Sequence, residues 1–194
     1  MRKLVVSTFL TLDGVMQAPG GEDEDREGGF EHGGWQMQEM DEAAGEAIDE
    51  VMRNAGALVL GRRTYDIFAG YWPNAGREEE GAIASQLNEM PKHVASTTLQ
   101  EPLEWQNSSL VDVPDGVAGL KEGSGKDLLV FGSSNLVQSL IRHGLVDEFR
   151  LQIYPLVLGS GKRLFGEGLP KTPLRVVDSR TTDTGIVLAT YHPA

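Results

Sequence analysis

The sequence lacks cysteine, and it has few basic residues for the number of its acidic ones. Without cysteine the chain forms no disulfide bond, thiolate nucleophile or cysteine-based metal site, and a cytoplasmic location is the simplest expectation. With 29 acidic against 17 basic residues, the formal charge of -12 repels a nucleic-acid backbone and an anionic membrane surface alike. No apolar run approaches the length of a membrane span, so we expect neither nucleic acid nor membrane as a partner.

Several motifs that would indicate other functions are absent or incomplete. Residues 159–163, Gly-Ser-Gly-Lys-Arg, resemble a phosphate-binding P-loop, but Leu156 and Arg163 stand where that motif needs Gly and Ser or Thr. An acidic run from Asp23 begins like a calcium loop, but Gly34 replaces the required glutamate. The histidines are scattered, and the serine-hydrolase motif Gly-x-Ser-x-Gly and the three-glycine Rossmann fingerprint are missing. We therefore expect no metal site and no ordinary Rossmann site.

The beginning of the chain predicts a buried strand followed by a polar loop. "KLVVSTFL" is apolar and β-branched, and it is followed by the turn pair Asp13-Gly14, which fits a first strand better than a signal peptide. Residues 18–35 are rich in glycine and acidic residues and have little to bury, which predicts a loop or flap that is able to move. The length of 194 residues suits one domain, residues 1–194.

Strands and helices alternate along the rest of the chain. Apolar residues recur at helical spacing over 36–54, with Gly56 as a C-terminal cap, and another helix begins near 62 with Thr64 as its candidate N-cap. The other expected elements are strands over 57–61, 92–97, 126–132 and 147–159, a helix over 78–88, and a terminal hairpin over 174–180 and 185–192. This order predicts a three-layer α/β domain with antiparallel strands at its C-terminal end.

Two of the strand-to-helix turns have the chemistry to bind an anion. In Gly132-Ser133-Ser134 a glycine permits close approach, and the following helix start offers unpaired N–H groups. In Gly61-Arg62-Arg63-Thr64 a similar turn adds two guanidinium groups and a hydroxyl. Because ligands of such sheets lie at the carboxyl ends of the strands, a ligand with several phosphates would bridge the two turns.

The order of these motifs resembles the dihydrofolate-reductase-like superfamily. The motifs are "TLDG" (11–14), "VLGRRTY" (59–65), "HVAST" (93–97), "VFGSSNL" (130–136) and "DEFRLQIYPLVLGSGKRLF" (147–165). They are most similar to the reductase domain of bifunctional riboflavin-biosynthesis deaminase-reductases and its stand-alone relatives. The resemblance covers nearly the whole chain, and "YPLVLGSGKRLF" is its most specific part. It implies an NADPH-dependent reductase with a mixed, mostly parallel sheet, acting on a substrate of the 5-amino-6-(5-phosphoribosylamino)uracil type.

The resemblance also implies roles for individual residues. Residues expected to hold the cofactor's phosphates and pyrophosphate are Gly61, Arg62, Arg63, Thr64, Ser96, Thr97, Gly132, Ser133, Ser134, Asn135 and Leu136. Asp13 and Gly14 would lie beside the nicotinamide, with Asp13 as the catalytic group that orients the substrate or relays a proton. Residues expected around the substrate are Gln152, Tyr154, Gly159, Ser160, Gly161 and Lys162, of which Lys162 would attract an anionic group. Residues 18–35 would close over the cofactor, with Phe30 or Trp35 excluding water.

Departures from the family's pattern keep other functions open. Riboflavin-pathway reductases usually have a basic residue after the Asp-Gly pair and a glutamate before the phosphate-binding glycine, where this chain has Val15 and Phe131. A second possibility is a dihydrofolate reductase, which uses a buried carboxylate on the first helix; Asp41 and Glu42 lie near that position. A third is an NADPH-binding protein without turnover. Because the terminal strands offer an edge for pairing, we also expect a homodimer.

Overall fold

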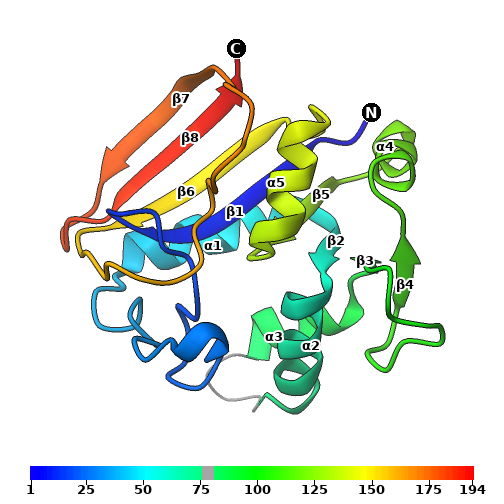
Figure 1. Ribbon diagram of the computed structural model, residues 1–194, viewed down its shortest axis with the longest axis horizontal. Helices are drawn as coiled ribbons and strands as arrows, with labels where there is room; N and C mark the ends of the chain where they lie inside the picture. Colours follow the sequence, from blue (N-terminus) through cyan, green and yellow to red (C-terminus); the bar gives the residue numbers. More distant parts are fainter. Residues whose placement is uncertain (76–80) are drawn as a thin grey trace.

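The structure, a computed structural model, describes residues 1–75 and 81–194, and an eight-stranded sheet forms its centre (Figure 1). The strands lie in the order β4-β3-β2-β5-β1-β6-β8-β7. Their bounds are β1 Leu4–Thr11, β2 Ala55–Gly61, β3 Lys92–Ala95, β4 Ser108–Val111, β5 Asp127–Phe131, β6 Glu148–Tyr154, β7 Leu174–Thr181 and β8 Val187–Pro193. The first six strands in this order pair in parallel, whereas β8 pairs antiparallel with both β6 and β7. The predicted mixed, mostly parallel sheet is confirmed.

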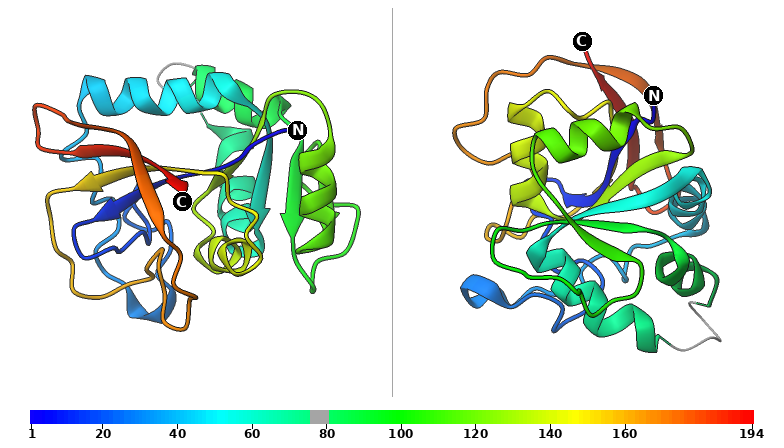
Figure 2. Two further views of the ribbon diagram at one scale, coloured as in Figure 1. Left: turned by 90° about the horizontal axis from the view of Figure 1, so that it is seen from above. Right: turned by 90° about the vertical axis from the view of Figure 1, so that its right-hand side faces the viewer.

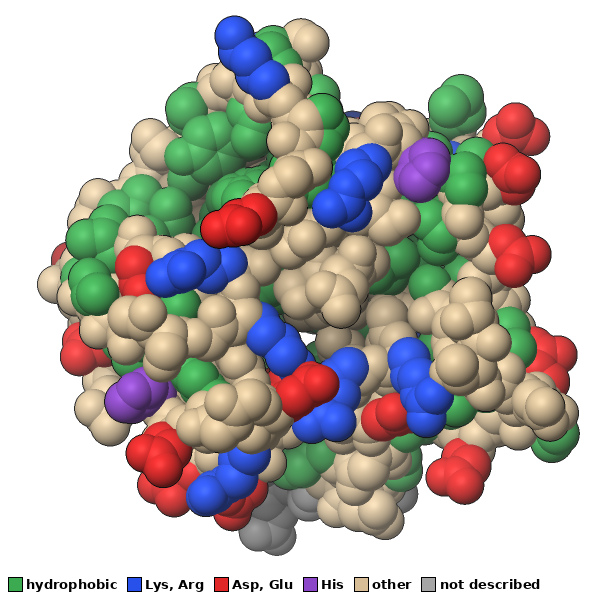
Figure 3. All heavy atoms as spheres, in the orientation of Figure 1, with side chains coloured by type: hydrophobic (Ala, Val, Ile, Leu, Met, Phe, Trp, Pro, Cys, Tyr) green, Lys and Arg blue, Asp and Glu red, His purple; other side chains and the backbone are tan. Residues whose placement is uncertain are grey.

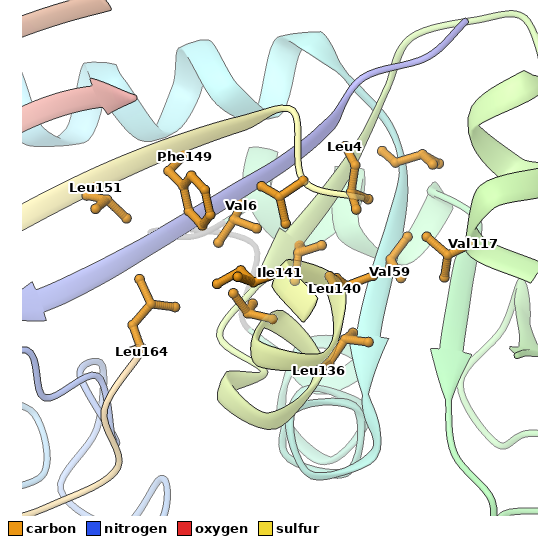
Figure 4. Close-up of a cluster of buried hydrophobic side chains, with 14 of the residues drawn as sticks. Leu4, Val6, Val59, Val117, Leu136, Leu140, Ile141, Phe149, Leu151 and Leu164 are labelled. Atoms are coloured by element: carbon orange, nitrogen blue, oxygen red, sulfur yellow. The ribbon is translucent and has the colours of Figure 1, made fainter. Parts of the chain in front are cut away.

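Helices cover both faces of the sheet and make the three layers (Figure 2). The α-helices are α1 Glu42–Asn54, α2 Arg62–Tyr71, α3 Gly81–Glu89, α4 Asp115–Glu122 and α5 Ser134–Arg142, with short 3-10 helices η1 Glu27–Gly29 and η2 Trp72–Asn74. The central strands are apolar on both faces because each face is covered by helices. In Figure 4, Leu4 and Val6 of β1 and Phe149 and Leu151 of β6 lie near Leu136, Leu140 and Ile141 of α5.

Several predicted element bounds differ from the structure. Helix α1 begins at Glu42 rather than 36, because the Asp41 carboxylate accepts a hydrogen bond from the Ala44 N–H and caps the helix. Gly56 is not a helix cap but part of β2, and β6 ends at Tyr154 instead of continuing to 159. The half-buried strand β4 and helix α4 were not predicted. Of the helix expected over 78–88, residues 78–80 lie outside the described residues.

The acidic loop, residues 18–35, is anchored by its few apolar residues. Phe30 and Trp35 are buried and pack with Val15 and Tyr154 in a hydrophobic cluster beside β1 and β6. The Trp35 indole N–H donates to the Gln17 carbonyl at 2.8 Å. The expectation that this segment has little to bury was therefore wrong, because two aromatic residues suffice to attach an otherwise polar loop. The loop crosses the carboxyl end of the sheet, next to the start of α2 (Figure 1).

Candidate functional site

The two predicted anion-binding turns lie side by side and are joined by hydrogen bonds. The Gly61 N–H at the end of β2 donates to the Ser133 hydroxyl at 2.9 Å, and the Ser133 N–H donates to the Thr64 hydroxyl at 3.0 Å. Strands β2 and β5 are neighbours in the sheet, so their helices α2 and α5 begin next to each other. Thr64 is thus not the N-cap of α2, which is Gly61; its side chain instead fixes the neighbouring turn.

The backbone of these turns leaves room and hydrogen-bond donors for a phosphate group. Gly132 and Ser133 have φ values of 53° and 59°, and a Cβ at Gly132 would lie 3.1 Å from the Thr64 Oγ1. Glycine therefore allows the turn to pack this closely without displacing Thr64. Within residues 1–75 and 81–194, neither α2 nor α5 has a side-chain N-cap, so no capping side chain there binds the first-turn N–H groups of Ser134, Asn135 and Leu136. Two adjacent uncapped helix N-termini fit a diphosphate.

Arg62 supplies positive charge at the outer side of this pair of turns. Its side chain is half exposed, contacts the Thr98 hydroxyl and makes a long ion pair, 3.4 Å, with Asp66. The hydroxyls expected near the cofactor's phosphate after β3 were those of Ser96 and Thr97. Ser96 instead receives hydrogen bonds from the N–H groups of Thr98 and Leu99, and Thr97 is exposed. The hydroxyl that the structure brings to Arg62 is that of Thr98, which follows the predicted Thr97.

Arg63, the second predicted cation, turns toward the acidic loop. Its Nη2 donates to Asp25 at 2.8 Å, and the same carboxylate accepts from Lys162 Nζ at 2.7 Å. Lys162 contacts Glu27 as well. Burial raises the pKa of Asp25, but hydrogen bonds from Lys162, from the Glu27 N–H and from Arg63 outweigh it and leave that pKa below its usual value. Asp25 was not predicted, because its partners lie 38 and 137 residues away.

Asp13 fixes the loop that follows β6. Its carboxylate accepts hydrogen bonds from the Thr11 hydroxyl at 2.6 Å and from the N–H groups of Leu158 and Gly159 at 3.2 and 2.9 Å. The Thr11 hydrogen bond is the largest cause lowering the Asp13 pKa to about 2. Asp13 is therefore ionised at neutral pH. Of its two predicted roles, orientation suits this environment better than proton transfer, because the protonated form is scarce. Gly14 follows with φ of 80°.

Gln152 and Tyr154 lie two residues apart on β6 and so point to the same face of the sheet, the one covered by α1. Each has a buried polar atom without a hydrogen-bond partner within the described structure. The Gln152 amide N–H donates to the Ala44 carbonyl at 3.0 Å, whereas its Oε1 and the Tyr154 hydroxyl are buried without a hydrogen bond. The Tyr154 ring packs edge-on against Trp35, with centroids 5.3 Å apart. Burial, and to a lesser degree the charge of Asp41, raises the pKa of Tyr154 to about 12. Buried polar groups of this kind usually have partners, so these two atoms are candidates for ligand contacts.

The loop of residues 159–162 packs against the segment that follows β1. The Met16 N–H donates to the Lys162 carbonyl, and the Lys162 N–H donates to the Gln17 side chain. Gly161 has φ of 120°, and a Cβ there would lie 2.7 Å from Val15 and 2.8 Å from Phe30. Ser160 is exposed. The side chains around this loop mix both signs of charge, and Figure 3 shows basic and acidic side chains interspersed around a hollow near the middle of this face.

Of the two carboxylates at the start of α1, Asp41 is occupied by hydrogen bonds and Glu42 is exposed. Asp41 caps the helix and also accepts from the N–H and hydroxyl of Thr184. Hydrogen bonds, first of all from Thr182, lower its pKa to about 2, and Glu42 is exposed. The α1 residue that meets Gln152 is Ala44, which has no acidic group.

One groove of the described structure lies away from these turns. It has a volume of about 330 Å³, is bounded by α1, β6, β7 and β8, and contains the paired charges of Glu50, Glu148 and Arg150. Gln152 is the predicted site residue that lines it. Among the described residues, no helix is long and apolar enough to cross a membrane.

Comparison with known proteins identifies a family model and two relatives that each match nearly the whole chain. Residues 2–188 match the model of the RibD C-terminal domain. The chain is 30% identical to YyaP of Bacillus subtilis (strain 168) over 193 residues, 98% of this chain and 95% of YyaP. It is 23% identical to YwjB of the same organism over 182 residues, 90% of this chain and 89% of YwjB.

Solved structures share the fold. A putative riboflavin biosynthesis protein from Shewanella sp. PV-4 has a TM-score of 0.68 at 22% identity, covering 99% of both chains. A pyrimidine reductase-like protein from Corynebacterium diphtheriae has 0.62 at 12%, covering 100% of this chain and 92% of the other. Dihydrofolate reductase from Enterococcus faecalis, complexed with NADP(H) and RAB-propyl, has 0.60 at 11%, covering 98% and 96%. The chain therefore has the dihydrofolate-reductase-like fold and belongs to the RibD C-terminal domain family of reductases.

Proposed function

We propose that this protein is an NADPH-dependent reductase that transfers hydride to a C=N or C=O carbon of a small heterocyclic or ribosylamine-type substrate. The observation that carries the proposal is the pair of uncapped helix N-termini at α2 and α5, joined through Ser133 and Thr64 and flanked by Arg62. A diphosphate fits the N-termini, and a further phosphate fits Arg62 with the Thr98 hydroxyl. These two features together match NADPH better than NADH.

The residues of the protein then bind and orient the cofactor and the substrate, and they exclude water. Bound NADPH supplies the hydride, so the chain needs no nucleophile of its own. The ionised Asp13 holds the loop after β6 in place, and the aromatic rings of Phe30 and Trp35 keep water from the reacting face. The Tyr154 hydroxyl is protonated at neutral pH and has no hydrogen-bond partner among the described residues, so we assign it to donate a hydrogen bond to the substrate atom that gains negative charge.

A turnover assay tests this proposal. Substrate-dependent oxidation of NADPH is followed by its absorbance, with pyrimidine substrates of the ribosylaminouracil type first and dihydrofolate second. We expect turnover with the former and a loss of kcat of about tenfold or more in Tyr154→Phe, since one charge-stabilising donor is removed. Tyr71→Phe, an exposed tyrosine outside the site, is the control. Tight NADPH binding without reduction of any substrate would leave a binding protein instead of an enzyme.

The structure favours this reductase over a dihydrofolate reductase. The latter needs a carboxylate that protonates the pterin, but Asp41 is occupied as a helix cap and Glu42 is exposed. Dihydrofolate turnover equal to that of the pyrimidine substrates would contradict this preference.

We also propose that two copies pair through β7. This strand lies at the edge of the sheet, and Val176 and Val177 are 58% and 47% exposed. An exposed edge strand is a typical site of strand pairing. Sedimentation should give a dimer, and Val176→Lys should give a monomer; a monomeric wild-type protein would refute this.

A further inference from the structure

Asp25 is a buried carboxylate that binds two cations from distant parts of the chain. Only 8% of its side chain is exposed, although the neighbouring acidic residues of the loop are mostly in solvent. One oxygen accepts from Arg63 of α2 and the other from Lys162 of the loop after β6. The carboxylate thus lies between the candidate cofactor turns and the candidate substrate loop, where a negatively charged ligand group would otherwise be expected.

A second carboxylate completes the charge balance of this cluster. Glu27 contacts Lys162 too, so two carboxylates face the two cations. The adjacent Arg163 is also matched, since its Nε donates to the Asp13 carbonyl and its Nη2 lies 3.6 Å from the Asp13 carboxylate. Every basic side chain around residues 159–163 is therefore already opposed by a carboxylate of the chain itself.

The cluster is held in place rather than being a chance surface contact. The Gln17 amide donates to the carbonyls of Asp25 and Glu27, and its Oε1 accepts from the Lys162 N–H. One glutamine thereby ties the acidic loop and the lysine to each other. Phe30 packs so closely on Gly161 that a Cβ there would overlap it. A ligand anion that pairs with Lys162 would have to displace a fixed carboxylate, and the buried Asp25 would then lose one of its two cations.

We infer that Asp25, assisted by Glu27, determines substrate specificity: the chain supplies its own counter-ion to Lys162 and Arg63, so the substrate part that lies against residues 159–163 carries no phosphate or carboxylate. This rests on the proposed function in that the ligand is taken to be the reductase substrate. It narrows the substrate class to compounds without a charged group at this end, such as an unphosphorylated ribosylaminopyrimidine. A dianion at this place would meet two carboxylates at short range.

Ribose 5-phosphate and ribose serve as charged and neutral probes in a binding test. Their effect on the backbone amide signals of Gly161 and Lys162 is followed by NMR in the wild-type protein, in Asp25→Asn/Glu27→Gln and in Asp23→Asn. Asp23 lies in the same loop but, among the described residues, pairs with the exposed Arg26, so it is the matched control. We expect ribose 5-phosphate to bind the double variant about tenfold or more tightly than the wild type, in a salt-dependent way. Binding of ribose and the properties of Asp23→Asn should not change.

Further variants show which side chain binds the added ribose 5-phosphate. They also keep the test valid if the double variant does not fold. Adding Lys162→Met to the double variant should abolish the gained affinity. Glu27→Gln alone changes a side chain that is 58% exposed, and it should give a smaller gain. The inference is overturned if wild-type protein binds ribose 5-phosphate at these amides as well as the variants do, or if the folded variants gain nothing. None of these outcomes depends on NADPH, whose binding is measured separately, so failure of the proposed function would be recognised independently.

Discussion

Replacing Gly132 by alanine tests how closely the α2 and α5 turns are packed. Alanine at a left-handed φ costs about 1 to 2 kcal/mol relative to glycine. At Gly132 the new Cβ would also lie 3.1 Å from the Thr64 Oγ1, which accepts the hydrogen bond of the Ser133 N–H. Moving that hydroxyl weakens a hydrogen bond worth about 1 kcal/mol. We therefore expect Gly132→Ala to lower the free energy of unfolding by about 2 to 3 kcal/mol.

Gly144 is the matched control, because it has a similar φ of 63° but no atom within 4 Å of its added Cβ. Gly144 lies just after α5, whereas Gly132 lies just before it. Because its added Cβ meets no atom, Gly144→Ala should show only the backbone cost of about 1 to 2 kcal/mol. Urea denaturation measures both losses, and a fluorescence titration measures NADPH binding. Gly132→Ala alone should weaken NADPH binding, by about tenfold, since the turn that holds the pyrophosphate is displaced.

A third variant isolates the Thr64 contact. In a Thr64→Ala background the crowding atoms are gone, so Gly132→Ala should cost no more than Gly144→Ala does. Equal losses of stability for Gly132→Ala and Gly144→Ala, with NADPH affinity unchanged in both, would refute the close packing of the two turns and its role in binding.

Further predictions concern the buried lysine and the two low-pKa carboxylates. Lys92 is fully buried, donates to the carbonyls of Leu87, Asn88 and Met90 at the end of α3, and lies 4.2 Å from the centre of the Trp105 ring. Lys92→Met should lower the free energy of unfolding, measured by urea denaturation, by about 3 kcal/mol, because these carbonyls lose their donor. Lys171 is exposed, so Lys171→Met should change the free energy of unfolding little. Equal effects of the two substitutions would contradict this. The pKa of Asp13 and of Asp41 is lowered from 3.8 to about 2, so each stabilises the fold above pH 4 and this stabilisation is lost as the pH falls toward 2. Wild-type and Asp13→Asn proteins should therefore differ in melting temperature at pH 6 and converge near pH 2; a difference independent of pH would show that the carboxylate charge is not the cause.

The parts of the site predicted from sequence are those with a local signal. The turns at Gly61 and Gly132 follow short buried strands, and strand-turn-helix order alone places them at the carboxyl edge of the sheet. Such local patterns also predicted the mixed sheet. Strand β4 was missed because its four residues are only half-buried and contain two serines, so they show neither an apolar run nor a clear alternation.

The features of the site that were not predicted from sequence depend on contacts between residues far apart in the chain. Asp25 looks like one more acidic residue of a polar loop, and only folding brings it to Arg63 and Lys162. Asp13 was singled out as an acid, but the N–H groups that bind its carboxylate belong to Leu158 and Gly159, 145 and 146 residues further along. Sequence patterns predict which segments form the site, whereas the protonation and pairing of its charged groups follow from the tertiary structure.

The most direct test of the reductase account is a titration of the purified protein with NADPH and NADH, followed by cofactor fluorescence, in wild type, Arg62→Ala and Arg26→Ala. Arg62 borders the candidate phosphate site, whereas Arg26 pairs with Asp23 on the exposed part of the loop. We predict tight NADPH binding, a clear preference over NADH, and loss of that preference by about tenfold or more in Arg62→Ala only. Failure of the wild-type protein to bind either nucleotide would contradict the account.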